Sequence, residues 1–242
     1  MLSIIYYIVV AAAWLVLYLL SVVAFVLCYP FDKKRAVVHK LSEWLTDTVF
    51  IFAPGMRREV IGVENIDPKQ AYVVVLNHQS MVDILSIYNL PLVFKWVSKK
   101  EVYRIPLVGR LLFMHGDIVI NRASAKEAMQ LVHTRGMKWL KKGASVAIFP
   151  EGTRSKNGEI QRFKSGAFAL AKEAGVEILP VVMDGTTKIF RPKSFWFNWK
   201  HRLTVKVLPP ISAEKVAATE TGDLSREVQE MMTEALSQIR KN

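Results

Sequence analysis

Cysteine is almost absent from this chain of 242 residues, whose single thiol is Cys28. One cysteine cannot form an intrachain disulfide, and it cannot build a thiolate metal site. The sequence therefore excludes a disulfide scaffold and a metal centre held by several thiolates. Because Cys28 lies inside a long apolar run, we interpret it as a lipid-facing side chain.

Charge is absent from residues 2–31, which are almost entirely apolar. A helix needs about 20 such residues to cross a bilayer. A cleavable signal peptide fits less well, because it would need a basic start, a shorter apolar core and a small-residue cleavage site. Lys33, Lys34 and Arg35 follow directly and predict that the rest of the chain lies on the cytoplasmic face of the membrane. The sequence leaves open whether the helix spans the bilayer or lies within one leaflet.

Acidic residues are outnumbered, with 21 Asp and Glu against 33 Lys and Arg, which gives a net charge of +12. This excess suits nucleic acid, anionic lipid or a phosphorylated substrate. Residues 191–202 interleave basic and aromatic side chains, as at a membrane headgroup layer or a single-stranded nucleic-acid site, although the aromatics are equally typical of a core. With an anchor in the chain, we expect anionic membrane lipids as partners and no nucleic acid. The sequence indicates no oligomeric state.

Beyond the apolar segment, residues 37–52 have helical apolar spacing and predict an amphipathic helix that ends at Pro54. We expect a membrane anchor over residues 1–56 and one catalytic domain over residues 57–242. Ser124 with Glu127 predicts a helix start, Gly175 a helix end, and an apolar stripe after Ser225 a C-terminal helix. The expected strands are residues 72–76, 93–97, 117–120, 146–149, 178–183 and 203–208. This alternation predicts an α/β fold with a central, mostly parallel sheet flanked by helices.

The first candidate site is residues 77–83, directly after an apolar strand. A neutral imidazole accepts a proton from an alcohol near neutral pH, and a carboxylate holds the ring in the useful tautomer. His78 and Asp83 match that pair, but a separation of five residues brings them together only if the intervening turn folds back. Alone, the pattern is more typical of a helix cap and a satisfied polar pair.

The second candidate site is residues 149–155, after another apolar strand. Gly152 would allow a close approach of backbone to ligand, and the Arg154 guanidinium would hold two phosphate oxygens at once. Alone, this segment is better explained as a turn with a solvated Arg–Glu pair.

Together the two segments resemble the glycerophospholipid acyltransferase family, which carries an Asn-His-x-x-x-x-Asp block and a Phe-Pro-Glu-Gly-Thr-Arg-Ser block. Residues 100–109 with 116–122 resemble the family's intermediate block, and residues 178–182 its fourth. Four blocks in order, over about residues 60–190, are a specific pattern.

The resemblance implies transfer of a fatty acyl chain from acyl-coenzyme A or acyl-carrier protein to the sn-2 hydroxyl of 1-acyl-sn-glycerol-3-phosphate, forming phosphatidic acid. It implies no cofactor and no metal. His78 would be the general base, oriented by Asp83. The acceptor's phosphate site would be formed by Arg122, Glu151, Gly152, Thr153, Arg154 and, more weakly, Lys100. The residues expected to support the motifs are Asn77, Pro106, Gly109, Pro150 and Pro180.

Two points of this site stay open in the sequence. Glu151 would repel phosphate, so it is better explained as a partner of Arg154 or of a backbone amide. The donors that stabilise the developing oxyanion are expected among backbone amides near residues 77–80 or near Gly152. The remaining histidines are interpreted as structural or surface residues: His39, His115, His133 and His201.

Three alternatives remain. An acyltransferase for another lysophospholipid is the nearest, because the blocks report chemistry rather than the acceptor. A membrane-tethered, basic nucleic-acid-binding protein explains the charge but not the two blocks. A catalytically inactive scaffold is opposed by the intact pair of His78 and Asp83.

Overall fold

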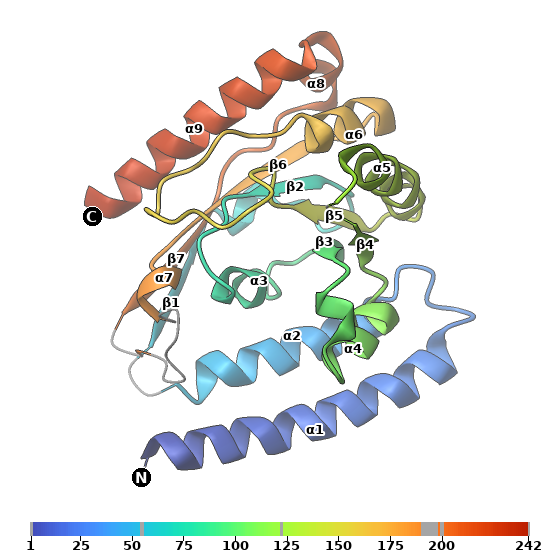
Figure 1. The fold of residues 1–242 in the computed structure, drawn as a ribbon, viewed down its shortest axis with the longest axis vertical. Helices are drawn as coiled ribbons and strands as arrows, with labels where there is room; N and C mark the ends of the chain where they lie inside the picture. Colours follow the sequence, from blue (N-terminus) through green and yellow to red (C-terminus); the bar gives the residue numbers. More distant parts are fainter. Residues whose placement is uncertain (1, 54–55, 122, 190–197, 199–200, 242) are drawn as a thin grey trace.

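The computed structural model describes residues 2–53, 56–121, 123–189, 198 and 201–241 (Figure 1). Its seven-stranded sheet has the order β1-β7-β6-β2-β5-β3-β4. Every neighbouring pair is parallel except β6 and β7. The strands are β1 Arg57–Ile61, β2 Val73–Leu76, β3 Phe94–Lys99, β4 Ile118–Ile120, β5 Ser145–Ile148, β6 Ile178–Asp184 and β7 Arg202–Val207. The expected α/β fold with a mostly parallel central sheet is confirmed.

Six of these strands coincide within two residues with those predicted from the sequence, and β1 was missed. The central strands are buried on both faces, so they are continuous apolar runs; all four residues of β2 are fully buried. In contrast, β1 is an edge strand whose five residues include Arg57, Arg58 and Glu59. An exposed edge tolerates charges, so β1 lacks the apolar pattern that revealed the other strands.

Helices cover both faces of the sheet. One face is covered by α5 (Ala125–Lys141), α6 (Gly166–Ala174), α8 (Ala213–Ala218) and α9 (Thr221–Lys241) (Figure 1). On the other side lie α2 (Ala36–Ile51), α3 (Val82–Ser86) and α4 (Val108–His115), with α1 (Leu2–Cys28) beyond α2. The short helix α7 (Thr186–Ile189) follows β6, and the 3₁₀ turns are η1 (Val63–Asn65) and η2 (Val102–Arg104).

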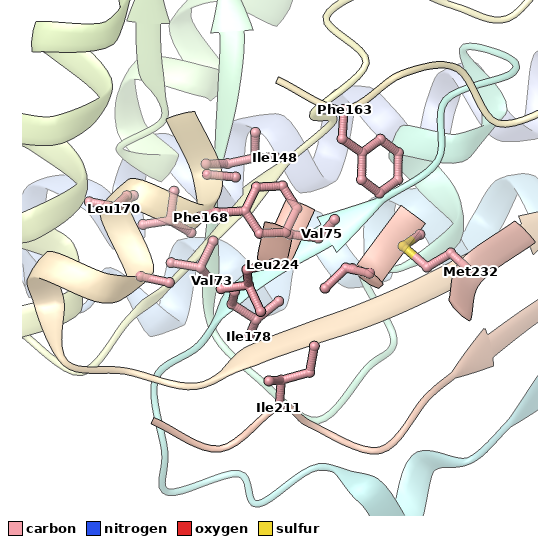
Figure 2. Packing of buried hydrophobic residues seen from close by; sticks show 14 of the residues in the cluster. Val73, Val75, Ile148, Phe163, Phe168, Leu170, Ile178, Ile211, Leu224 and Met232 are labelled. Atoms are coloured by element: carbon pink, nitrogen blue, oxygen red, sulfur yellow. The ribbon is translucent and has the colours of Figure 1, made fainter. Parts of the chain in front are cut away.

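The larger core lies between the sheet and α6 and α9. Figure 2 shows the ring of Phe168 from α6 among Val73 and Val75 of β2 and Leu224 of α9. Phe168 is fully buried, and burial of such a side chain contributes about 1.5–3 kcal/mol. This packing fixes β2 and β5, the two strands that precede the sequence motifs.

The predicted helix ends are present. Ser124 Oγ accepts a hydrogen bond from the Glu127 amide at 3.3 Å, which caps α5. Gly175 ends α6 with φ 64°, a left-handed conformation that favours glycine. The C-terminal helix begins at Thr221, four residues before Ser225.

The N-terminal helices pack against each other (Figure 1). Tyr6 on α1 donates to the Val49 carbonyl at 3.1 Å, and Trp14 Nε1 donates to Thr48 Oγ1 at 3.2 Å. Within α1, residues 4–28 are long and apolar enough to cross a membrane, and almost none of that stretch is buried in the protein. One such helix near the N-terminus is weakly consistent with membrane association, and the division of domains at residue 56 stays a prediction.

The second predicted helix is present as α2, and it also packs on α3 and α4. His39 of α2 is buried, and its Nδ1 lies 2.8 Å from His115 Nε2 at the end of α4. The basic and aromatic segment expected near the membrane lies mostly outside the described residues, which here include only Asn198, His201 and Arg202.

Candidate active site

The two sequence motifs meet at one edge of the sheet. The strands β2 and β5 are parallel neighbours, so residues 77–83 and 149–155 leave the sheet side by side at their carboxyl ends. That edge is where α/β folds place their ligand sites.

His78 and Asp83 are in direct contact. His78 Nδ1 lies 2.8 Å from Asp83 Oδ2, because the turn after β2 brings the first turn of α3 back towards the strand end. Asp83 Oδ2 also accepts hydrogen bonds from the backbone amides of Gln79 (2.6 Å) and Ser80 (2.7 Å). The carboxylate is fully buried. A charge-stabilising group is thus fixed behind the imidazole before any substrate arrives.

The imidazole of His78 is held on one face by Phe149. Their ring centroids are 3.9 Å apart with an interplanar angle of 16°. Because Asp83 occupies Nδ1, the nitrogen available to a substrate is Nε2. The His78 side chain is 11% exposed and borders a cavity of about 360 Å³. The other lining residues are Met81, Ile84, Trp96, Val97, Ser98, Lys99, Glu101, Val102, Ile105, Phe149, Thr153 and Arg154.

Glu151 does not face this cavity. Its carboxylate accepts hydrogen bonds from the backbone amides of His78 (2.7 Å) and Gln161 (3.1 Å). Burial raises the pKa of the carboxyl to about 7, and the two amide bonds oppose that rise. Of the two partners left open by the sequence, the backbone amide is therefore the one observed. Glu151 connects the loop that carries His78 to the loop that follows β5.

Thr153 and Arg154 line the cavity, and their role in binding the acceptor's phosphate stays a prediction. Gly152 has φ 72°, which lets the chain turn sharply between buried Glu151 and exposed Thr153. Lys100 does not line the cavity, whereas the neighbouring Lys99 does. Arg122 lies outside the described residues.

The residues expected to support the motifs form hydrogen bonds that hold neighbouring strands and loops together. Asn77 bonds Met183 twice: its Nδ2 donates to the Met183 carbonyl (2.9 Å) and its Oδ1 accepts from the Met183 amide (2.7 Å). These bonds extend the pairing of β2 with β6 beyond the strand end. The carbonyl of Pro180 accepts from the Leu208 amide and that of Pro150 from the Lys164 amide, both at 3.0 Å.

Gly109 is required by close packing. A Cβ at this position would lie 2.0 Å from the carbonyl oxygen of Tyr103, so only glycine allows α4 to approach the turn η2. Pro106 precedes α4, and its carbonyl accepts from the Val108 amide at 2.7 Å. This motif therefore shapes the cavity wall formed by Val102 and Ile105.

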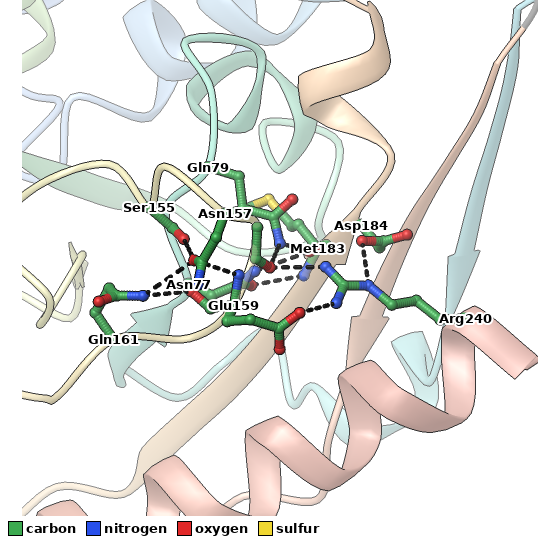
Figure 3. Close-up of polar contacts among 10 residues, drawn as sticks. Asn77, Gln79, Ser155, Asn157, Glu159, Gln161, Met183, Asp184 and Arg240 are labelled. Carbon is green, nitrogen blue, oxygen red and sulfur yellow. Dashed lines mark hydrogen bonds and ion pairs between the residues drawn. The ribbon is translucent and has the colours of Figure 1, made fainter.

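A polar network behind the site holds the loop that follows residue 154 (Figure 3). Gln79 Nε2 donates to the Gly158 carbonyl at 3.1 Å. From α9, Arg240 donates to the same carbonyl and to Glu159, both at 2.7 Å, and to Asp184 at 3.1 Å. The C-terminal helix thus fixes a loop whose other end carries Arg154.

Most of the backbone amides expected to stabilise an oxyanion already have acceptors. The amide of His78 is bonded to Glu151, and those of Gln79 and Ser80 are bonded to Asp83. The Gly152 amide donates to the Phe149 carbonyl at 3.1 Å. Among the described residues, no group of three or more His, Cys, Asp and Glu side chains could hold a metal ion.

Comparisons with known proteins identify the family of this chain. The Acyltransferase family model matches residues 57–184. This chain belongs to that family. The family assignment made from the four sequence blocks is confirmed.

The similar proteins are named for one activity. A 1-acyl-sn-glycerol-3-phosphate acyltransferase of Saccharomyces cerevisiae is 30% identical over 90% of this chain and 72% of its own length. The protein of that name from Borreliella burgdorferi is 31% identical over 87% of this chain and 80% of its own. The crystal structure of the 1-acyl-sn-glycerophosphate acyltransferase from Thermotoga maritima matches with a TM-score of 0.74 and 25% identity, covering 98% of each chain.

Sequence reasoning missed several cavity residues. Trp96 and Lys99 on β3 reach the cavity through the fold and belong to no catalytic pattern in the sequence. Ile105, after η2, lies in the intermediate block but was not named as a site residue. Lys99 was recognisable as a basic residue two residues after the expected strand 93–97. His115 was missed as a partner of Asp117, two residues away, although its Nδ1 lies 2.6 Å from Asp117 Oδ1.

Proposed function

We propose that this acyltransferase moves a fatty acyl chain from a thioester to the sn-2 hydroxyl of 1-acyl-sn-glycerol-3-phosphate, forming phosphatidic acid. The observation that carries the proposal is the contact of His78 with Asp83 beside a cavity that also presents Arg154. The activity named for the similar proteins, from yeast, a spirochaete and Thermotoga maritima, supports the same acceptor.

The reaction needs one proton acceptor. His78 Nε2 removes the proton of the acceptor hydroxyl as the oxygen attacks the thioester carbonyl. The tetrahedral intermediate collapses, the carbon–sulfur bond breaks, and the imidazolium returns the proton to the thiolate. Asp83 keeps the ring in the required tautomer and stabilises the imidazolium. No other reactant is required.

The oxyanion needs a donor that is still free. Thr153 lines the cavity, and among the described residues its amide donates to no acceptor. We therefore assign the Thr153 amide, at the turn made by Gly152, as the leading donor, since the amides of residues 78–80 are already bonded.

The acceptor's phosphate is assigned to basic residues at the cavity. Arg154 is the best placed, and Lys99 joins it from the end of β3. Arg122 and Lys100 remain further candidates from the family resemblance. Glu151 is a positioning residue, because both of its oxygens are bonded to backbone amides.

The donor's acyl chain has an apolar surface available. A neighbouring cavity of about 260 Å³ shares Val97 and Phe149 with the cavity at His78 and continues along Ile120, Met129 and Val132. Its walls suit a hydrocarbon chain. Either acyl-coenzyme A or acyl-carrier protein supplies the same thioester carbonyl.

The substrates also place the enzyme at a membrane. A lysolipid acceptor stays in the bilayer, and α1 offers an exposed apolar helix of the required length. Lys33, Lys34 and Arg35 follow α1, which favours the cytoplasmic face and contact with anionic lipids.

A direct assay tests the proposal. Purified full-length protein is given 1-acyl-sn-glycerol-3-phosphate with each donor, and the lipid product is identified by mass spectrometry. Phosphatidic acid is expected from at least one donor, and His78→Ala serves as the control. A panel of lysophospholipids with larger headgroups tests the nearest alternative: preference for one of them would replace the assigned acceptor. Tight RNA binding without any transfer would favour a nucleic-acid-binding protein.

A further inference from the structure

A second cavity, of about 540 Å³, lies at the opposite edge of the sheet from His78. Two of its lining residues, Asp117 and Lys142, lie just before the first residues of β4 and β5. His78 and Thr153 lie beyond the carboxyl ends of β2 and β5, which are parallel neighbours. The two cavities share no lining residue, although Val102 of η2 lines the first and its neighbour Tyr103 lines the second. The second cavity has a volume typical of ligand sites.

The second cavity carries a large excess of positive charge. Its basic lining residues are Lys33, Arg35, Arg135, Lys138 and Lys142. Four of them, all except Arg35, are exposed, and none of these four forms an ion pair within the part of the chain that the structure describes. Unpaired cations that converge on one cavity attract an anion.

Both acidic residues of the cavity bond to groups of the protein, Asp32 through both carboxylate oxygens and Asp117 through Oδ1. The Asp32 carboxylate accepts hydrogen bonds from the Ala36 and Val37 amides, both at 2.8 Å, and so caps α2. Asp117 Oδ1 accepts from the Trp96 amide at 2.9 Å and lies 2.6 Å from His115 Nδ1. Neither carboxylate forms an ion pair with any of the five basic lining residues.

The wall of the cavity is fixed in advance. The Arg35 guanidinium donates to the Phe113 and Met114 carbonyls at the end of α4, at 2.5 and 3.2 Å. It also lies 5.4 Å from the centre of the Trp139 ring, and Lys142 Nζ lies 4.8 Å from that centre. Gly116 has φ 91°, and a Cβ there would lie 2.5 Å from Trp139. These contacts hold Arg35, Lys142 and the Trp139 ring in place without a ligand.

One side of the cavity is apolar and adjoins the membrane helix. Tyr29 and Pro30 line it directly after α1 ends at Cys28, and Phe113 of α4 lines it while remaining 61% exposed. Aromatic side chains beside cations, at the end of an apolar helix, match the boundary between acyl chains and headgroups. A free phosphate ion would gain nothing from these rings.

We propose that this cavity binds the phosphate headgroup of an anionic membrane phospholipid, with its acyl chains against the end of α1. The site is separate from the catalytic cavity. Because Lys138 lies on α5 and Lys33 lies between α1 and α2, a bound headgroup ties the anchor to the catalytic part of the chain.

The test measures lipid retention without acyl donor or acceptor, so its result does not depend on the proposed reaction. Purified full-length protein in a nonionic detergent is titrated with dioleoyl phosphatidylglycerol or dioleoyl phosphatidylcholine, and bound lipid is counted by native mass spectrometry. We expect one phosphatidylglycerol to be retained in preference to phosphatidylcholine. Lys138→Gln combined with Lys142→Gln should weaken that retention by about tenfold or more.

The matched control is Lys126→Gln combined with Lys141→Gln, which removes the same charge from α5 outside the cavity, whereas the test pair lies on α5 and at its C-cap. This control should retain phosphatidylglycerol, and so should Arg154→Ala, which alters only the assigned acceptor site. All variants should keep the thermal unfolding midpoint of the parent protein. Equal losses in both lysine pairs would overturn the proposal in favour of diffuse charge. Loss in Arg154→Ala would assign the lipid to the catalytic cavity, and displacement by equimolar inorganic phosphate would indicate a free-phosphate site.

Discussion

His78 is the residue on which the proposed chemistry depends most directly. If its Nε2 removes the acceptor's proton, His78→Ala should lower kcat by about 10²–10⁴-fold. Asp83→Asn should also lower kcat severely, because an amide next to Nδ1 favours the wrong tautomer. Steady-state kinetics with a circular dichroism check of folding measures both effects. A folded His78→Ala protein with full activity would rule out the mechanism.

Substitution of Arg154 is expected to change the acceptor's KM, whereas substitution of His78 changes kcat. Loss of Arg154 should raise the acceptor's KM, and Arg154→Lys should restore binding only in part, since an ammonium lacks the two parallel donors of a guanidinium. The comparison needs a second acceptor without phosphate, for which Arg154→Ala should change little. Equal losses for phosphorylated and neutral acceptors would contradict the assignment.

Glu151 offers a test that separates positioning from phosphate binding. Its two oxygens accept from two backbone amides, whereas glutamine has one oxygen and would direct an NH₂ group at the other amide. Glu151→Gln should therefore destabilise the fold by about 1–3 kcal/mol and lower kcat. The measurements are urea unfolding and acceptor kinetics. A variant of normal stability with a lowered acceptor KM would instead mean that the carboxylate faces the phosphate.

At the scale of elements, the sequence predicted what depends on local pattern. The buried strands are continuous apolar runs, and α5 begins where Ser124 accepts from the Glu127 amide. The edge strand β1 has no such pattern. The contact of Glu151 with the His78 amide spans 73 residues and depends on the parallel pairing of β2 with β5. The pair of His78 and Asp83 was predictable as residue types, but the turn that brings them together was not.

The packing of α2 on α4 is expected to depend on pH. Burial, with the nearby charge of Lys95, holds the pKa of His39 and of His115 well below its usual value. The unfolded chain takes up these protons below about pH 6.5 and the folded chain does not, so stability should fall as pH decreases from there. Asp117 opposes this trend. Burial raises the pKa of its carboxyl to about 7, so as pH decreases the folded chain takes up this proton before the unfolded chain does, which stabilises the fold. Lys40, Lys95 and Arg35 are the other charged groups nearby.

The difference between variants isolates the histidine contribution. His39→Gln should reduce the slope of unfolding free energy between about pH 6.5 and 5.5, by at most about 1.4 kcal/mol per pH unit. Urea unfolding in detergent at several pH values measures this slope. His133→Gln on α5, where the ring pairs with Glu173 near the surface, is the matched control. An unchanged slope in His39→Gln would show that His39 does not titrate on unfolding.

At the scale of the whole molecule, α1 should hold the protein to a membrane by apolar contact, and the basic residues should add an electrostatic term. High salt screens charges beyond about 3 Å at 1 M and leaves the apolar term intact. The intact protein should therefore stay with membranes through a high-salt wash. A variant without residues 1–30 keeps Asp32 and its cap on α2, so it should fold but become partly extractable by salt. It should lose turnover on vesicle-bound acceptor more than on detergent-dispersed acceptor.

A chain that starts near Arg57 provides the comparison, because it also lacks α2. That helix buries His39 against His115, and it buries Val38, Leu41 and Leu45, so its removal exposes part of the core. We expect this shorter chain to lose activity on both forms of acceptor, whereas the variant without residues 1–30 keeps activity in detergent. Membrane fractionation at 1 M salt and parallel assays on vesicles and micelles measure the two effects. Release of the intact protein by salt alone would show that charge, and not α1, holds the enzyme at the bilayer.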